Sequence, residues 1–286
     1  MSLGRSIGRV RQFFNHRAQG RLVERRMASN IEYALPDFVI VGVMKCGTTS
    51  LFNHLISHPC IAEPLVKGVK YYNKSFDRGE GWYRAHFPAQ ADLDELQAVQ
   101  GIAMTGESSP DYLPDPDAAK RLKALTPDAK LILLLRDPVT RAFSHYHYRK
   151  VRGRESLSFE QAVENNLNSL KKEQQGVELL RDHANYTSYL GRGLYMPQLR
   201  HWFEEFPKEQ FLVVSSEDFS TDAQSVYADV TEFLNLPAHS LINTNKHNTG
   251  KYKKMANSTR QDLIDYFRPH NQELFKFAGR EFDWQS

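Results

Sequence analysis

Long apolar runs are missing from this sequence of 286 residues, and it contains only two cysteines. No stretch approaches the ~18 consecutive apolar residues of a membrane-spanning helix. Cys46 and Cys60 provide neither a disulfide framework nor the ligand spacing of a zinc site. The N-terminus lacks the continuous apolar segment of a signal peptide. These absences predict a protein of a reducing compartment, and we expect a cytoplasmic location.

The sequence also has little net charge, and it lacks linkers and repeats. Its formal net charge is only +3, so a nucleic-acid partner is not indicated. No Pro/Gly/Ser-rich stretch interrupts the middle of the chain, and no internal repeat is visible. With 41% hydrophobic residues the chain can build a sizeable core, which favours one large domain.

Positive charge is concentrated at the N-terminus, where residues 1–26 carry seven arginines and one glutamate. Apolar residues recur there at roughly helical spacing: Ile7, Val10, Phe13 and Phe14. We therefore expect a basic helical extension at residues 1–35. It could rest on an anionic membrane surface or pack on a partner, or it could lie outside the domain without a function of its own.

Apolar runs and amphipathic patterns alternate along the rest of the chain. The apolar runs predict strands at 36–44, within 102–116, at 131–138 and at 210–219. Helical periodicity follows Thr48 and recurs at 91–100, 117–125, 141–151, 157–170, 175–185, 193–207, 222–235 and 258–276. Strands that alternate with helices predict an α/β fold, with a mostly parallel sheet and helices on both faces.

A small-residue loop joins the first strand to its helix in the stretch VGVMKCGTTSLFNHL. Thr48, Thr49 and Ser50 suit the first turn of that helix. A strand, a tight glycine turn and a helix N-terminus bring several backbone N–H groups together and bind anions. Lys45 would then be a cation beside a bound phosphate, although a solvated loop lysine is the alternative.

A second strand ends in the charged stretch RDPVTRAFSHYHYRK. Arg141 and Ser144 are an i,i+3 pair on one helix face, and Arg136 lies at the strand tip. A guanidinium and a hydroxyl suit a phosphate group, whereas the simpler reading is a local ion pair of Arg136 with Asp137. Together the two loops predict a ligand with two separated phosphate-like groups.

The first loop is not the phosphate loop of an ATPase or kinase. That loop places its lysine after the last glycine, whereas Lys45 precedes Gly47. No strand clearly ends in the acidic residue that would hold magnesium. The sequence therefore favours a metal-free transfer from a nucleotide over the chemistry of a P-loop small-molecule kinase.

Several motifs resemble those of sulfotransferases that use 3′-phosphoadenosine 5′-phosphosulfate (PAPS), especially the Golgi heparan sulfate branch and its bacterial relatives. MKCGTTSL is similar to the family's 5′-phosphosulfate loop, and LLLRDPVTRAFSHY is similar to its 3′-phosphate motif. GWYRAHFP, TGESSPDYL and LFKFAGREFDW follow in a similar order and spacing. The resemblance covers Pro36 to Trp284. It implies a P-loop NTPase-like sulfotransferase fold at residues 36–286, with a central sheet flanked by helices.

The resemblance also implies an activity and a role for each motif residue. The enzyme would move the sulfuryl group of PAPS to a hydroxyl or amine, most plausibly of a glycan, and release adenosine 3′,5′-bisphosphate. Lys45 would neutralise charge on the departing bisphosphate. Arg136 and Ser144 would bind the 3′-phosphate. The remaining nucleotide contacts would come from the first loop and from a late loop: Cys46, Gly47, Thr48, Thr49, Ser50, Gly250, Lys251 and Tyr252.

Two positions depart from the resemblance. The first is Ser108 in the run Glu107-Ser108-Ser109, where the branch has a lysine. At the second, the heparan sulfate branch has a glutamate, its general base, where this chain has Gly68 in the run KGVKYY. Glu63 and Glu107 are the nearest carboxylates for a relocated base. A catalytically weakened PAPS-binding protein is the alternative function. If only the base is missing, Gly68→Glu should raise sulfotransfer at least tenfold.

Two further groups of residues leave alternatives open. Lys67, Lys70, Lys74 and Arg78 form a basic run that suits an anionic acceptor or a solvated surface. A set of aromatic residues could stack on a sugar or line the core: Tyr71, Tyr72, Trp82, Tyr83, Phe87 and Tyr112. His145 and His147 are two apart on a helix and point different ways, so they do not predict a metal pair.

Overall fold

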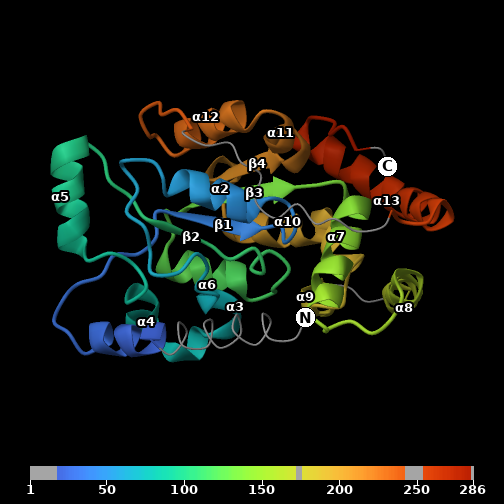
Figure 1. The fold of residues 1–286 in the computed structure, drawn as a ribbon, viewed down its shortest axis with the longest axis horizontal. Helices are drawn as coiled ribbons and strands as arrows, with labels where there is room; N and C mark the ends of the chain where they lie inside the picture. Colours follow the sequence, from blue (N-terminus) through green and yellow to red (C-terminus); the bar gives the residue numbers. More distant parts are fainter. Residues whose placement is uncertain (1–17, 172–175, 242–253, 285–286) are drawn as a thin grey trace, which may run out of the picture.

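Four parallel strands form the central sheet of the computed structural model, which describes residues 18–171, 176–241 and 254–284 (Figure 1). The strand order is β2-β1-β3-β4. The strands are β1 (Phe38–Gly42), β2 (Gly106–Ser108), β3 (Lys130–Leu135) and β4 (Phe211–Ser215). The α/β class and the parallel sheet predicted from the sequence are confirmed.

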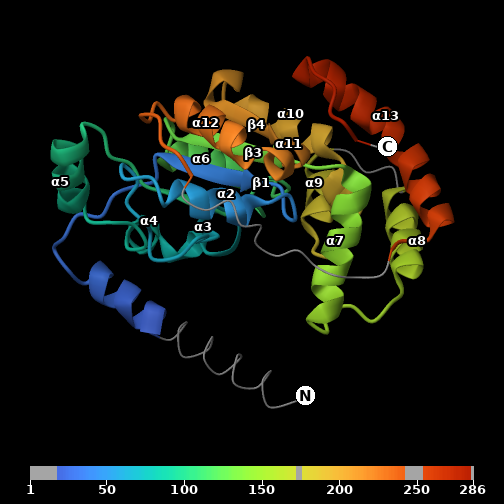
Figure 2. The same cartoon turned by 45° about the horizontal axis from the view of Figure 1, so that its top comes forward.

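Helices cover both sides of this sheet, as Figures 1 and 2 show. The first half of the chain contains α2 (Thr48–Leu55), α3 (Tyr71–Lys74), α4 (Glu80–Arg84), α5 (Gln90–Gln100), α6 (Ala118–Leu125) and α7 (Pro138–Val151). The second half contains α8 (Phe159–Leu170), α9 (Gly176–Ala184), α10 (Tyr195–Glu205), α11 (Ser216–Thr221), α12 (Ala223–Phe233) and α13 (Asn257–Ala278). Short 3₁₀ turns are η1 (Phe76–Arg78), η2 (Gly191–Gly193) and η3 (Lys208–Gln210).

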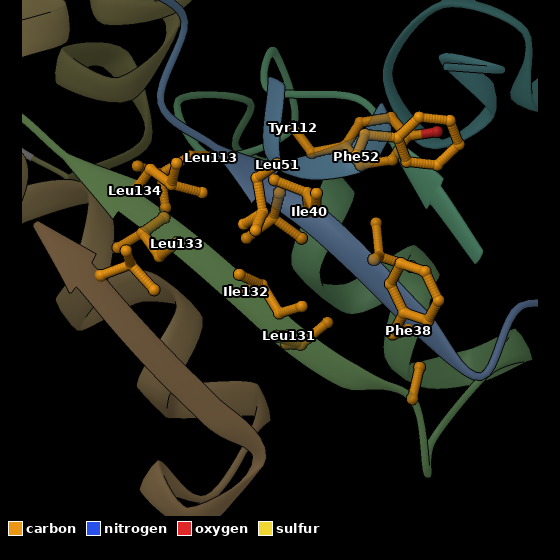
Figure 3. Packing of buried hydrophobic residues seen from close by; sticks show 14 of the residues in the cluster. Phe38, Ile40, Leu51, Phe52, Tyr112, Leu113, Leu131, Ile132, Leu133 and Leu134 are labelled. Atoms are coloured by element: carbon orange, nitrogen blue, oxygen red, sulfur yellow. The ribbon is translucent and has the colours of Figure 1, made fainter. Parts of the chain in front are cut away.

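Buried apolar strands explain why the sheet could be recognised from the sequence. All five residues of β1 are buried, and so are the last five of β3. Parallel strands covered on both faces have this continuous apolar pattern. Figure 3 shows Ile40 of β1 and Leu133 of β3 packed in the core together with Leu51 of α2. The packing fixes the strand ends, and with them the loops that carry polar residues.

One helix start and one strand end differ from the prediction, because a side chain caps a helix at each place. The helix predicted from residue 141 begins at Pro138, because the Asp137 carboxylate accepts a hydrogen bond from the Val139 N–H (3.0 Å) and caps α7. The strand predicted at 210–219 was too long. It ends at Ser215, whose side chain accepts from the Asp218 N–H (3.0 Å) and starts α11.

The described part of the basic N-terminal extension is helical at residues 18–27 and packs on the domain. Val23 is only 4% exposed, and Arg26 donates to the carbonyls of Ala85 (3.2 Å) and Phe87 (2.8 Å). Among the residues that the structure describes, no helix has the length and apolar character needed to cross a bilayer. A contact of the extension with a membrane stays a prediction.

Candidate active site

The loop between β1 and α2 turns tightly around Lys45 and Gly47. Both residues have left-handed backbone conformations, with φ of +78° and +91°. A lysine adopts this conformation rarely, and such residues cluster at functional sites. Through this turn the chain passes from the carboxyl end of β1 into the N-terminus of α2.

Three backbone N–H groups at this N-terminus are free to bind a ligand. Within the described residues, the N–H groups of Gly47, Thr48 and Thr49 make no hydrogen bond. The N–H of Cys46 donates to the Val43 carbonyl (3.2 Å), so it is not available in the way predicted from the sequence. Gly47 caps the helix without a side-chain hydrogen bond. The side chains of Thr49 and Ser50 are half-buried beside it. This geometry can hold an anion.

Lys45 lies beside this anion-binding turn, among other cations. Its Nζ is 4.7 Å from the centre of the Tyr148 ring, and the guanidinium carbon of Arg152 is 3.6 Å from the same ring. Burial, together with Arg152 and Arg136, lowers the pKa of Lys45. A negatively charged ligand would relieve this repulsion between cations.

Arg136 connects the end of β3 to the first loop. Its guanidinium donates to the Lys45 carbonyl (3.2 Å) and to the Thr140 hydroxyl (3.1 Å). The simpler reading, an ion pair of Arg136 with Asp137, does not hold, because the Asp137 carboxylate caps α7. Ser144 is buried in the second turn of α7.

Arg141, which shares the helix face of Ser144, is fully buried and donates to the Tyr189 carbonyl. The hydrogen bond from Arg136 to the Lys45 carbonyl joins the two predicted phosphate loops.

A cavity of about 370 Å³ opens next to Lys45. It lies where β1, β2 and the helix after β3 meet, at the carboxyl ends of parallel strands, which is where such folds bind ligands. Of the basic run, Lys67 and Lys70 line the cavity. Lys74 instead lies 5.8 Å from the Tyr186 ring, and Arg78 lies 5.4 Å from the Trp82 ring.

A buried carboxylate, Asp111, anchors the wall of this cavity. It pairs with Arg192 (2.8 Å) and Lys70 (3.2 Å) and accepts a hydrogen bond from the Tyr186 hydroxyl (2.7 Å). Although burial opposes it, the two cations hold the pKa of Asp111 below its usual value. Sequence reasoning missed this group, since Asp111 and Arg192 are 81 residues apart. The only local signal is the position of Asp111 just after a strand.

Glu107, proposed from the sequence as a relocated base, lies in a buried hydrogen-bond network. Its carboxylate is fully buried and accepts four hydrogen bonds, from the Val69 N–H (2.8 Å) and the hydroxyls of Ser109 (2.6 Å), Tyr83 (2.8 Å) and Tyr112 (2.9 Å). Burial raises the pKa of Glu107. Glu107 does not line the cavity, and neither does Glu63, which is exposed. The side chain of Glu107 links the residues after β2 to the segment before α3 and to α4.

Gly68 lines the cavity, but the backbone approaches too closely there for a larger residue. A Cβ atom at this position would lie 2.5 Å from the Ser108 carbonyl oxygen. The course of the backbone at Gly68 thus leaves no room for a glutamate side chain. The expectation that Gly68→Glu raises activity tenfold stays a prediction, and the backbone would have to move before a glutamate could fit there.

The remaining predicted residues have these places. The aromatic set packs in the core or at its edge, and none of its members lines the cavity. His145 is fully buried and lines the cavity, whereas His147 is half-buried. Among the described residues no three His, Cys, Asp or Glu side chains gather as metal ligands would. Gly250, Lys251 and Tyr252 lie outside the described residues, so their role stays a prediction.

Comparison with known proteins agrees with this geometry. The sulfotransferase domain family matches residues 35–286. A membrane-associated sulfotransferase (kil1) of Dictyostelium discoideum is 28% identical over 88% of this chain and 67% of its own length. Heparan sulfate glucosamine 3-O-sulfotransferase 3A1 of Mus musculus is 30% identical over 87% of this chain and 64% of its own. The chain thus spans about two thirds of these relatives. A crystal structure of a sulfotransferase from Alicyclobacillus acidocaldarius matches with a TM-score of 0.67 and 29% identity, covering 87% of this chain and 98% of that one.

Proposed function

The chain belongs to the sulfotransferase domain family, and on that premise we propose that it transfers the sulfuryl group of PAPS to a hydroxyl or amine of an acceptor, in the first place a glycan. The proposal rests on the turn at the N-terminus of α2. Three backbone N–H groups there make no hydrogen bond within the described chain, and the same turn contains Lys45, whose carbonyl accepts a hydrogen bond from Arg136. A glycan acceptor is supported by the relatives named for heparan sulfate glucosamine.

The residues at the turn fit a nucleotide with two phosphate groups. The N–H groups of Gly47, Thr48 and Thr49 would hold the 5′-phosphosulfate, with help from the hydroxyls of the first helical turn. Arg136 and Ser144 would bind the 3′-phosphate, which ATP lacks, and would thereby select PAPS. The bound nucleotide supplies an activated sulfuryl group.

Lys45 would act on the charge that develops during transfer. Lys45 belongs to the same turn as these N–H groups, and its ammonium would stabilise the negative charge that the leaving bisphosphate gains. An interaction that strengthens as charge develops lowers the barrier more than it strengthens ground-state binding. The nearby cations Arg136 and Arg152 add to the positive potential at this point.

Two other functions are less well supported. A kinase would need a carboxylate for magnesium at the end of a strand, and the carboxylates after β3 and β2 are engaged: Asp137 caps α7, and Asp111 pairs with Arg192 and Lys70. A PAPS-binding protein without activity remains the second candidate, because Gly68 leaves no glutamate in the cavity. The cytoplasmic location expected from the sequence stays a prediction.

Two measurements test the proposed function. Adenosine 3′,5′-bisphosphate should raise the melting temperature, whereas Mg-ATP should not, because a ligand stabilises the native state according to its affinity. Transfer of label from ³⁵S-PAPS should then be measured with heparosan, N-sulfated heparosan, chondroitin and 4-nitrophenol as acceptors. Stabilisation by Mg-ATP alone would favour the kinase. Stabilisation by the bisphosphate without transfer to any acceptor would favour the binding protein.

A further inference from the structure

Lys67 lies in the cavity beside Lys45 with its side chain unengaged. Its backbone carbonyl accepts a hydrogen bond from the Ser108 N–H (2.7 Å), which fixes the residue alongside β2. Within the described residues, however, the Lys67 side-chain nitrogen has neither a hydrogen bond nor an ion pair. A lysine that its backbone holds at a cavity, and whose side chain makes no hydrogen bond or ion pair within the described chain, is available to a substrate.

Transfer to a hydroxyl or amine requires a group that accepts the proton of that acceptor. The carboxylates near the cavity are engaged. Glu107 is surrounded by four donors and lies outside the cavity lining. Asp111 is paired with Arg192 and Lys70, so its proton affinity is low.

His145 is a weaker candidate than Lys67. Both of its ring nitrogens are buried and find no hydrogen-bond partner among the residues that the structure describes. Burial, followed by the charges of Arg141, Arg192, Arg149 and Lys45, holds the pKa of His145 well below its usual value. An imidazole among four cations binds a proton poorly and would give it up at once.

Charged groups of both signs surround Lys67, whereas those around His145 are all cations. Burial and the neighbouring Lys70 lower the pKa of Lys67 to about 8, while Asp111 and Glu107 oppose that shift. A base works best when its pKa lies near the working pH. Besides Lys67 and Lys70, the described residues that line the cavity include these charged or titratable groups: Lys45, Asp111, His145, Tyr148, Arg149, Arg154 and Tyr186.

We propose that the neutral amine of Lys67 accepts the proton of the acceptor group during sulfuryl transfer. The acceptor oxygen or nitrogen forms its bond to sulfur while the bond between sulfur and the 5′-phosphate oxygen breaks. The bisphosphate leaves with that electron pair, and the proton moves to the Lys67 Nζ, which becomes an ammonium and later releases it to water. The inference rests on the proposed function.

Two substitutions separate a base from a binding cation. Lys67→Arg keeps a positive charge that cannot be lost, and Lys67→Met removes the charge. Both should lower turnover at saturating PAPS by about a hundredfold, with bisphosphate affinity changed less than twofold. Turnover of the wild type should rise with pH to an inflection near 8. That inflection should be missing from both variants and present in the control Lys70→Arg.

A second measurement does not depend on turnover. Brief acetylation with acetic anhydride over a range of pH, read by peptide mass spectrometry, reports the proton affinity of each lysine. Lys67 should react with a midpoint near pH 8, below that of Lys70, whose pKa the pairing with Asp111 raises although burial opposes it. A Lys67 midpoint that coincides with that of Lys70 would overturn the inference.

The kinetic outcomes distinguish this inference from the proposed function. If the wild type transfers sulfate and Lys67→Arg does so equally well, a permanent cation suffices and the proton-acceptor role is wrong. If the wild type binds the bisphosphate and sulfates no acceptor of the panel, the proposed function fails, and the role of Lys67 fails with it.

Discussion

The guanidinium of Arg136 donates a hydrogen bond of 3.2 Å to the backbone carbonyl of Lys45. The bond joins the end of β3 to the loop after β1, and these two strands are neighbours in the sheet. The residue proposed for the 3′-phosphate thus also positions the residue proposed for the leaving group. Substitutions of Arg136 should therefore alter turnover as well as nucleotide affinity.

Ser144→Ala and Arg136→Ala should differ in their effect on turnover. Loss of a hydrogen bond to a charged group costs ~1.5–3 kcal/mol, so both should weaken bisphosphate binding by about tenfold or more. Ser144→Ala should leave turnover at saturating PAPS unchanged, since its contact contributes to ground state and transition state alike. Arg136→Ala should also lower turnover, because the Lys45 carbonyl loses its partner.

Isothermal titration with the bisphosphate and steady-state kinetics measure the two effects separately. Equal affinity in Ser144→Ala and the wild type, with lower turnover, would contradict the assignment of Ser144. Unchanged turnover in Arg136→Ala would show that the hydrogen bond to Lys45 has no part in positioning the loop.

Lys45→Ala should lower kcat by a hundredfold or more, which is the usual cost of removing one electrostatic donor from a transition state. The fold should survive, because Lys45 is a half-buried loop residue without a carboxylate partner in the described chain. Kinetics with saturating PAPS and a thermal melt check this, with Lys120→Ala on the exposed face of α6 as the control. Wild-type turnover in Lys45→Ala would remove the lysine from the mechanism.

Gly68→Ala should destabilise the protein by about 1–3 kcal/mol, as overpacking usually does. The added methyl would lie 2.5 Å from the Ser108 carbonyl oxygen. Gly81→Ala is a matched control, because a Cβ there meets no atom of the described residues within 4 Å. Urea unfolding of both variants gives the comparison. A well-folded Gly68→Glu protein with tenfold higher turnover would instead support the missing-base hypothesis drawn from the sequence.

Asp111→Asn should cost ~3–5 kcal/mol at neutral pH, because it leaves Arg192 charged and buried. The pKa of Asp111 is lower in the folded state than its ordinary 3.8. Its stabilisation is therefore complete above pH 3.8 and is lost as the pH falls through the folded-state value. Urea unfolding between pH 3 and 7 should show the difference from wild type shrinking at the acidic end.

The matched control is Asp117→Asn, since Asp117 forms an exposed pair with Arg121 (3.2 Å). Such pairs contribute ~0–1 kcal/mol. A loss in Asp111→Asn no larger than in Asp117→Asn would mean that burial adds nothing to the strength of the Asp111 pair.

Local patterns explain most of what the sequence predicted of the fold. The strands at 36–44 and 131–138 were evident because both of their faces are buried and apolar. The strand within 102–116 was harder to delimit, since β2 consists of only the three residues Gly106–Ser108, and none of them has an apolar side chain. The end of β4 was missed because the Ser215 cap acts through the three-dimensional position of its hydroxyl.

The two phosphate loops were predicted because each lies within one short motif. The other parts of the cavity come from residues far apart in the chain. Asp111 and Arg192 meet only through the fold, and nothing near either residue indicates the other. Gly68 reads as a lost glutamate in the sequence, whereas its proximity to the Ser108 carbonyl is a property of the backbone path.

The position of Gly68 also bears on how the sheet avoids self-association. β2 is an edge strand, and an open edge invites strand addition from another chain. Here the Ser108 N–H donates to the Lys67 carbonyl, and the Ala62 N–H donates to the Met104 carbonyl, so the chain before α3 runs along that edge. The segment that brings Lys67 to the cavity thereby also shields the β2 edge against aggregation.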